Sequence, residues 1–220
     1  MRVSCFPWLQ PGSVGEYKSL NRLSITRFDD AKGYLTVGES ERVAHGGKIS
    51  GMNEISLAKA TIRKQILETR RGSNPSNQEL TANLLAVVDQ LKPERVGTYV
   101  SYPSEPSTEE FIDSLKQLGV TVLIPETSGE NGLRWHELFE GTPAQLSPGD
   151  LLFIPALAVD ELGNRLGRGK GYFDRELTGL EDVVVYAVVF ESEVLESVPV
   201  EKHDQRVDGV VTQEQIRKIN

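Results

Sequence analysis

The sequence predicts an α/β protein, a three-layer sandwich around a largely parallel sheet. Apolar runs such as 151–159 and 183–190 show no polar alternation, which is typical of strands covered on both faces. Segments of helical period separate these runs, as expected for strands joined by helices. The 220 residues, 38% hydrophobic and 25% charged, suit one such domain with a sizeable core.

Residues 1–51 do not follow this pattern. They show no sustained period of 3.6 or 2, and glycine and proline interrupt every candidate element. They are either an irregular, disordered extension or upstream sequence included because the start was mis-assigned. A coherent pattern begins at Met52, so we expect the functional domain to span residues 52–220.

A first helix is predicted from its N-cap, Ser56. Its apolar side consists of Leu57, Ile62, Ile66 and Leu67.

Three cations of this helix, Lys59, Arg63 and Arg70, follow a spacing of i, i+4 and i+11 and share one face. The spacing alone favours a solvated cationic face.

The rest of the chain alternates strands and helices. Capping-box patterns at Ser76–Glu79 and Ser107–Glu110 open two further helices, and the second of these ends at Gly119. Strands are expected at 95–102, 120–125, 133–138, 151–159, 183–190 and 209–212.

A glycine-rich cationic loop directly follows the most apolar run, 151–159, and precedes a short predicted helix at 172–180. The loop and the start of that helix contain Arg165, Leu166, Gly167, Arg168, Gly169, Lys170, Gly171, Tyr172, Phe173 and Asp174. Glycines let backbone N–H groups approach oxyanions closely, and Arg or Lys neutralises their charge. The pattern therefore predicts a phosphate site.

The loop matches neither of two familiar phosphate motifs. A P-loop requires Ser or Thr after Gly-Lys, and here Gly171 follows Lys170; Asn164 stands where its first glycine should be. The glycines at 167, 169 and 171 also lack the spacing of the dinucleotide fingerprint. The cations together with Asp174 favour nucleotide chemistry, which needs phosphate ligands and a metal carboxylate.

Bulk composition excludes several classes of function. A net charge of −8 and a pI near 5.1 argue against a nucleic-acid binder, whose footprint is a basic face. Cys5 is the only cysteine, so there is no disulfide framework or thiolate metal cluster. No run approaches the ~20 apolar residues of a membrane span. We expect a cytoplasmic, monomeric protein that acts on small molecules.

At its glycine-rich loop the sequence resembles the 5-formyltetrahydrofolate cyclo-ligase family, also called 5,10-methenyltetrahydrofolate synthetase. The resemblance covers about residues 56–215, and the segments that carry it are 59–63, 105–108, 153–174 and 198–212. It implies a NagB/RpiA/CoA-transferase-like fold. It also implies conversion of 5-formyltetrahydrofolate to 5,10-methenyltetrahydrofolate with ATP as co-substrate and Mg²⁺ as cofactor, through a phosphorylated formyl group.

The resemblance also implies roles for individual residues. Lys59, Arg63 and residues 165–173 would bind ATP. Val100, Glu105 and residues 168–172 would bind the folate, and Arg168 and Lys170 would be catalytic. Asp174 and Asp204 would hold Mg²⁺, with Asp208 competing for the role of Asp204. Glu105 has an alternative role as a carboxylate that stabilises the dipole of the helix after it.

The chain departs from the family between Leu133 and Gly149, where a Pro-containing segment that helps to line the folate pocket is shortened. Trp135 and His136 are either substitute pocket residues or part of the core. The shortening keeps open a non-catalytic folate- or nucleotide-binding paralogue. A sugar-phosphate enzyme of similar architecture is the third hypothesis, but it gives no role to Lys59, Arg63 or the two aspartates.

Overall fold

The computed structural model describes residues 54–71, 77–102, 104–129 and 132–219. It also describes the backbone of a short antiparallel pair, β1 (Phe28–Asp29) and β2 (Tyr34–Leu35). The predicted irregular extension, residues 1–51, lies outside the described residues except for this pair. The predicted helix cap at Ser76 also lies outside them. Within the described part, every helix is too short or too polar to cross a membrane.

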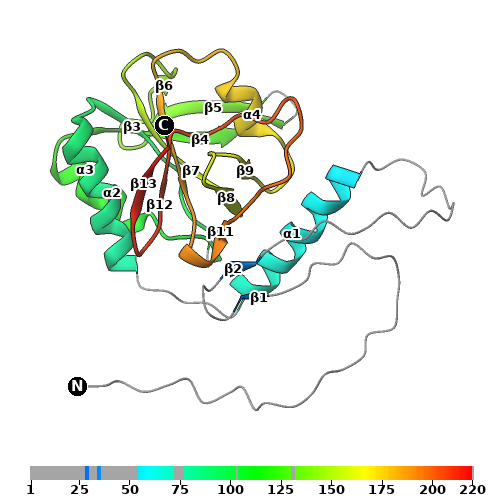
Figure 1. Ribbon diagram of the computed structural model, residues 1–220. Helices are drawn as coiled ribbons and strands as arrows, with labels where there is room; N and C mark the ends of the chain where they lie inside the picture. The colour runs from blue at the N-terminus through cyan, green and yellow to red at the C-terminus, as the bar shows by residue number, and fades with distance from the viewer. Residues whose placement is uncertain are drawn as a thin grey trace, which may run out of the picture.

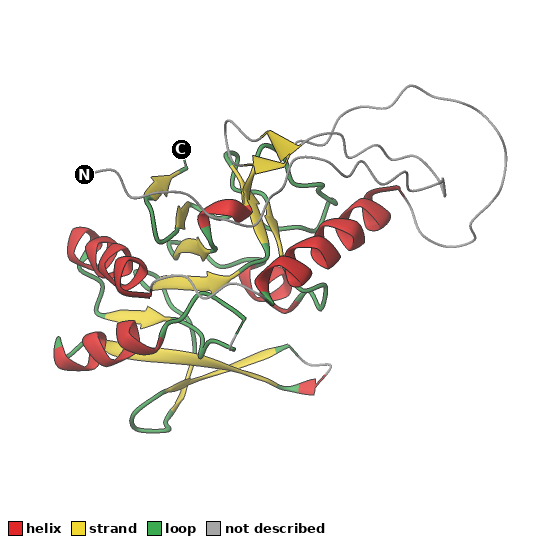
Figure 2. Ribbon diagram, turned by 90° about the horizontal axis from the view of Figure 1, so that it is seen from below, coloured by secondary structure: helices red, strands yellow, loops and turns green. Residues whose placement is uncertain are grey.

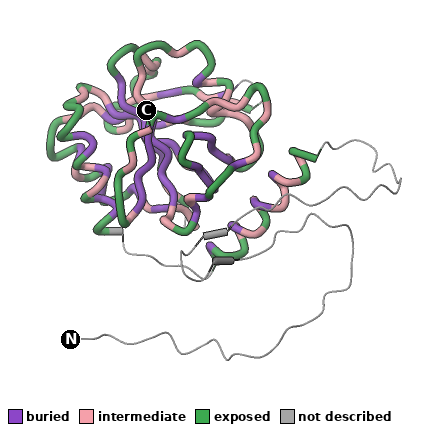
Figure 3. Tube along the Cα trace, in the orientation of Figure 1, coloured by how far each residue is buried: buried purple, intermediate pink, exposed green. Residues whose placement is uncertain are grey.

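An eight-stranded sheet forms the centre of the molecule (Figure 1). In spatial order its strands are β13 (Ile216–Lys218), β12 (Gly209–Val211), β10 (Val184–Val188), β7 (Leu151–Pro155), β3 (Arg95–Gly97), β4 (Thr121–Thr127), β5 (Leu133–Glu137) and β6 (Pro143–Ala144). The strands from β12 to β4 run parallel, and β13, β5 and β6 are antiparallel at the two edges. Figure 3 shows that the central strands are buried.

Helices α2 (Asn77–Leu91) and α3 (Glu109–Gln117) pack on one face of this sheet (Figure 1). Phe111 of α3 meets Phe153 of β7 edge to face, with ring centroids 5.2 Å apart. The short helix α4 (Tyr172–Leu177) contributes Leu177 to the core on the other face. The prediction of an α/β fold with a largely parallel sheet flanked by helices is confirmed.

A second, three-stranded sheet lies beside the large one. It consists of β11 (Val194–Leu195), β8 (Ala158–Asp160) and β9 (Arg165–Leu166), and the short 3-10 helix η2 (Glu191–Glu193) precedes β11. Helix α1 (Glu54–Arg70), the long helix on the right of Figure 2, packs Ile62 and Ile66 against this sheet. The small sheet therefore joins α1 to the rest of the domain.

The prediction of one strand over 151–159 is wrong, because the run divides between the two sheets. Pro155 ends β7; proline has no amide hydrogen to donate to a sheet ladder. Leu157 N then donates to Leu166 O of β9 at 2.7 Å, and β8 follows in the small sheet.

The predicted strand over 95–102 ends at Gly97. Thr98 N still donates to Leu123 O of β4 at 2.9 Å, and from Tyr99 on the hydrogen bonds go to residues 106–108 instead. The carbonyl of Tyr99 accepts a hydrogen bond from the Thr108 hydroxyl, and the Tyr99 hydroxyl donates to Pro106 O at 2.8 Å. The predicted capping box at Ser107–Glu110 is also wrong. Thr108 is the N-cap residue, and its hydroxyl makes no cap hydrogen bond.

Helix α1 begins at Glu54, so the predicted N-cap, Ser56, lies inside it. Leu57, predicted on the apolar side, is 46% exposed. The buried face instead consists of Lys59, Ile62, Ile66 and Arg70. Two of the three predicted surface cations are therefore buried, and the interpretation as a solvated cationic face is wrong.

Candidate active site

A cavity of about 580 Å³ opens at the carboxyl ends of β3, β4 and β7, the edge where open parallel sheets commonly bind ligands. Every predicted site residue lines it: Lys59, Arg63, Val100, Glu105, Arg165, Leu166, Gly167, Arg168, Gly169, Lys170, Gly171, Tyr172, Phe173, Asp174 and Asp204. The structure brings them together, and their roles toward ligands stay predictions.

The cavity has two sides of different chemistry. We call Lys59, Arg63, Asp204 and residues 165–174 the cationic side, because every described Lys and Arg that lines the cavity is among them. We call the opposite walls the apolar side. It consists of Tyr99, Val100, Tyr102, Glu105, Ile124, Pro125, Glu126, Thr127, Leu133, His136 and Leu138.

Helix α1 supplies two cations to the cationic side. Lys59 is 4% exposed, and its Nζ lies 3.0 Å from Glu201 Oε2 and 2.5 Å from Asp204 Oδ2. Arg63 Nε donates to Gly167 O at 2.9 Å. Both contacts join α1 to segments more than a hundred residues away, so the helix holds the loop and the Asp204 segment together.

The far end of α1 is anchored by Arg70. Its guanidinium is buried and donates to both carboxylate oxygens of Glu193, at 2.6 and 2.7 Å. It also donates to Ala156 O at 2.7 Å, a residue that lines the cavity. Burial raises the pKa of Glu193, and the hydrogen bond from Arg70 opposes that shift.

The path of the loop depends on two glycines in the left-handed region, Gly169 at φ 96° and Gly171 at φ 64°. Residues with a Cβ rarely adopt these angles. Gly171 directly precedes α4, and Arg175 Nη1 donates to Lys170 O at 3.2 Å. The ammonium of Lys170 makes no hydrogen bond or ion pair within the part of the chain that the structure describes, so it is available to an anionic ligand.

Arg165 and Asp174 form an ion pair inside the loop, with Nη2 and Oδ1 2.8 Å apart. Gln205 N also donates to Asp174 Oδ1, at 3.2 Å, which attaches the loop to the Asp204 segment. Burial lowers the pKa of Arg165, and Asp174 opposes that shift. Its Nε is buried without a partner among the described residues.

The aspartates fit a hard divalent cation. In each of them one oxygen is taken by protein donors, Oδ1 of Asp174 and Oδ2 of Asp204. The other oxygen accepts no hydrogen bond from the described residues, although His203 Nε2 lies 3.9 Å from Asp204 Oδ1. Carboxylate oxygens of this kind suit Mg²⁺. Burial raises the pKa of Asp204, but hydrogen bonds from Lys59 and from Glu201 N outweigh it, so the net pKa is lowered.

Asp208, the rival of Asp204, is placed elsewhere. Its Oδ2 accepts from Val185 N at 2.8 Å, and it does not line the cavity. This placement favours Asp204 as the metal carboxylate.

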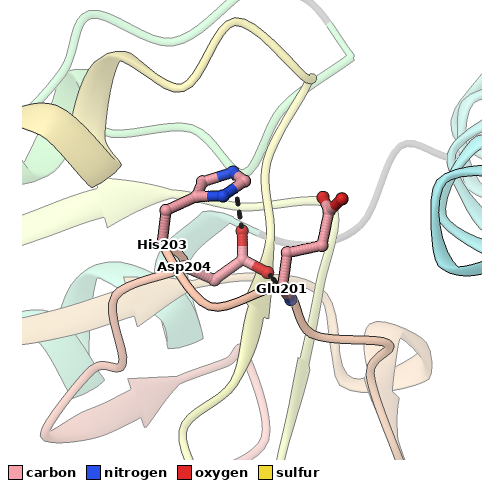
Figure 4. A group of neighbouring side chains, drawn as sticks. All are labelled: Glu201, His203 and Asp204. Atoms are coloured by element: carbon pink, nitrogen blue, oxygen red, sulfur yellow. Dashed lines mark hydrogen bonds and ion pairs between the residues drawn. The ribbon is translucent and has the colours of Figure 1, made fainter.

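Figure 4 shows a second group that includes Asp204, together with Glu201 and His203. Their ligand atoms lie within 4.8 Å of one another. Lys59 Nζ already contacts the two carboxylates, and Mg²⁺ prefers oxygen to imidazole nitrogen. The group therefore does not add a metal site.

Glu105 connects the two sides of the cavity. Its side chain is 6% exposed, and Oε1 pairs with Arg168 of the loop, with distances of 3.0 Å to Nε and 2.9 Å to Nη2. Oε2 accepts from Tyr102 N at 3.1 Å. Helix α3 starts only at Glu109, so these contacts do not support a role for Glu105 in stabilising its dipole.

The short segment 133–149 contributes little to the cavity. Leu133, His136 and Leu138 line it, and residues 139–149 do not. Trp135 belongs to the core, 5% exposed, with Nε1 donating to Glu176 at 2.9 Å. Of the two substitute pocket residues considered, only His136 faces the cavity.

Sequence reasoning missed most of the apolar side and the floor of the cavity. The missed lining residues are Tyr99, Tyr102, Ile124, Pro125, Glu126, Thr127, Leu133, Leu138, Pro155, Ala156 and Leu157. Most of them lie in or directly after the predicted strands 95–102, 120–125 and 151–159. The rule that ligands bind at the carboxyl ends of parallel strands was the available signal.

Comparisons with known proteins agree with one another. Residues 55–145 and 139–213 match the profile of the 5-formyltetrahydrofolate cyclo-ligase family. A 5-formyltetrahydrofolate cyclo-ligase of Mycolicibacterium smegmatis is 32% identical over 181 residues, covering 70% of this chain and 93% of the relative. The protein of the same name from Mus musculus is 32% identical over 161 residues, covering 60% and 79%.

Two solved structures have a similar fold. The 5,10-methenyltetrahydrofolate synthetase of Aquifex aeolicus superimposes with a TM-score of 0.62 at 22% identity, covering 74% of this chain and 93% of that one. The synthetase of Mycoplasma pneumoniae gives a TM-score of 0.63 at 20% identity, covering 71% and 99%.

Proposed function

Because this chain belongs to the 5-formyltetrahydrofolate cyclo-ligase family and is a ligase of that family, we propose that it uses ATP to convert 5-formyltetrahydrofolate into 5,10-methenyltetrahydrofolate. The products besides the folate are ADP and phosphate. One observation carries the proposal: a single cavity has a cationic side suited to a triphosphate and an opposite side with a buried carboxylate, Glu105.

The proposed chemistry starts with the formyl oxygen. It attacks the γ-phosphorus of ATP, an O–P bond forms, and ADP leaves. N10 of the folate then attacks the activated formyl carbon of the iminium phosphate and loses its proton. The carbon–oxygen bond breaks, so phosphate leaves with the former formyl oxygen. A formamide oxygen is a weak nucleophile, so positioning and charge stabilisation must supply the rate enhancement.

The residues on the cationic side suit these tasks. We assign Arg168 and Lys170 to the transferring phosphoryl group as catalytic residues. Both line the cavity, and Lys170 has no competing partner among the described residues. Lys59 and Arg63 hold the Asp204 segment and the loop in register. Asp174 and Asp204 would hold Mg²⁺, which supplies charge neutralisation at the triphosphate when bound.

On the apolar side we assign Glu105 to the pterin, where a carboxylate can accept paired N–H donors. Arg168 contacts Glu105, which places the proposed pterin contact next to the proposed phosphoryl contact. Val100 lines the same wall. This arrangement would bring the formyl group on N5 to residues 168–172.

We also propose that the protein acts in the cytoplasm as a monomer. The single cysteine suits a reducing compartment.

The test is formation of the methenyl product, followed by its absorbance. Purified protein, ATP, Mg²⁺ and 5-formyltetrahydrofolate should give product, and omission of ATP or addition of a chelator should abolish it. Folded protein that gives no product at micromolar concentration contradicts the proposal.

Residues 139–149 do not line the cavity, and this favours a second candidate, a non-catalytic paralogue that binds folate or nucleotide. Thermal stabilisation by either ligand without product would identify it.

A further inference from the structure

Two apolar side chains at the mouth of the cavity are unusually open to solvent. Val100 is 61% and Tyr102 is 70% exposed, yet both line the cavity. Aromatic side chains are common in the lining of ligand cavities, where a bound ligand covers them.

The backbone beneath the Tyr102 ring is held in place. Tyr102 N donates to Glu105 Oε2 at 3.1 Å, and Glu105 N donates to Tyr102 O at 2.8 Å. Glu105 is fixed in turn by Arg168. A ring on a braced backbone loses little conformational entropy when a ligand covers it.

The exposed fractions of Glu105 and Tyr102 show which of them lies deeper in the cavity. The Glu105 side chain is 6% exposed and the Tyr102 residue is 70% exposed, so Glu105 lies inward and Tyr102 outward. If the pterin of a folate contacts Glu105, the next part of the molecule, the p-aminobenzoyl ring, extends outward through the mouth of the cavity.

The charges on the apolar side also favour contact with the p-aminobenzoyl ring. Arg168 is the cation that reaches the apolar side, and it is paired with Glu105, while Glu126 adds a second carboxylate there. The glutamate tail of a folate therefore has no strong cationic partner on this side. Besides the polar groups of Glu105, Thr127 and His136, this wall offers ring contact with Tyr102.

We propose that the Tyr102 ring packs against the p-aminobenzoyl ring of the folate substrate and determines specificity for it. This inference rests on the proposed function. An aromatic contact of this kind is worth about tenfold in affinity, so Tyr102 distinguishes a full folate from a pterin that lacks the second ring.

The experiment compares Tyr102→Ala and Tyr102→Phe with the unmodified protein. In Tyr102→Ala the KM for 5-formyltetrahydrofolate should rise about tenfold while the KM for ATP stays unchanged. Tyr102→Phe should restore the folate KM. Phe139→Ala serves as the matched control, because Phe139 is an exposed aromatic residue that does not line the cavity.

A fragment separates the two rings of the substrate. 5-Formyl-6-methyltetrahydropterin lacks the p-aminobenzoyl group, and as a competitive inhibitor it should bind the unmodified protein and Tyr102→Ala equally well. If Tyr102→Ala loses the same affinity for the fragment as for the full folate, Tyr102 contacts the pterin and the inference is overturned. An unchanged folate KM in Tyr102→Ala would also overturn it.

The ring contact can be tested even if the proposed function fails. If the unmodified protein forms no methenyl product, thermal stabilisation by 5-formyltetrahydrofolate alone replaces KM. Stabilisation that Tyr102→Ala loses and Tyr102→Phe keeps supports the ring contact. Equal stabilisation of all three proteins, or of none, overturns it.

Discussion

The two sides of the cavity are built in different ways. On the cationic side, charges are paired before any ligand arrives: Lys59 with Asp204, and Arg165 with Asp174. The apolar side has one buried carboxylate, Glu105, and its outer residues Val100 and Tyr102 are mostly exposed. One side is therefore preorganised by electrostatics, and the other offers surface for a ligand to cover.

This difference indicates where each kind of mutation should act. A phosphoryl transfer depends on charges placed where negative charge develops, so changes on the cationic side should lower kcat. Contacts with the non-reacting parts of a substrate act mainly on binding, so changes on the apolar side should raise KM.

The largest effect is expected for Lys170→Ala. The loop loses the ammonium that no described residue neutralises, and kcat should fall by roughly a hundredfold or more with an unchanged melting temperature. Lys64→Ala, at an exposed position of α1 outside the cavity, is the matched control and should keep full activity. Near-normal turnover of Lys170→Ala would remove this ammonium from the chemistry.

Asp174→Asn should have the next largest effect. Losing one of the two carboxylates proposed to hold the metal should raise the Mg²⁺ concentration for half-maximal activity about tenfold or more. In this variant, ATP with Mg²⁺ should raise the melting temperature no more than ATP alone does. This measurement does not depend on turnover. Asp113→Asn, at an exposed position of α3, should leave both unchanged. A normal Mg²⁺ requirement would contradict the metal assignment.

Gly169→Ala tests the geometry of the loop. Its Cβ would lie in ordinary contact with Arg63 Cζ, at 3.4 Å, but the φ of +96° is one that L side chains rarely adopt. Relief of this strain should shift the loop and its phosphate ligands, so activity should fall about tenfold. Gly179→Ala has a similar φ of +83° with open space around it. Both variants should lose about 1–2 kcal/mol of unfolding free energy, and only the first should lose activity. Equal activities would show that the loop tolerates displacement.

The smallest effect is expected for Tyr99→Phe on the apolar side. It removes the hydroxyl that donates to Pro106 O and should cost about 1 kcal/mol of unfolding free energy. We expect the folate KM to change by less than about threefold, because the hydroxyl is committed to the protein backbone. A larger change with normal stability would mean that this hydroxyl contacts substrate.

The sequence predicted the cationic side better than the apolar side, for a physical reason. Phosphate chemistry requires particular residue types at short spacing, so Arg165 and Asp174 stand out in one stretch of chain. Lys59 and Arg63 were indicated by their spacing only as a face of a helix, and the resemblance supplied their role. That Lys59 is buried against Asp204, 145 residues away, has no local signature, because the topology alone brings them together.

The apolar side leaves a weaker pattern in sequence. Ile124, Leu133 and Leu138 look like ordinary strand residues, and which face they present depends on register and on where a strand ends. The break at Pro155, which sends the chain into the small sheet, shows the same limit. Tyr102 gave no signal, because a single aromatic residue in a loop has no period to detect.

The central claim is that the two sides of this cavity bring the formyl oxygen to the γ-phosphorus of ATP. The direct measurement uses 5-formyltetrahydrofolate labelled with oxygen-18 in the formyl group, with mass analysis of the products. The account predicts that the label appears in the released phosphate, because the formyl oxygen forms the O–P bond and leaves with phosphorus. Label found in water, with unlabelled phosphate, would contradict it.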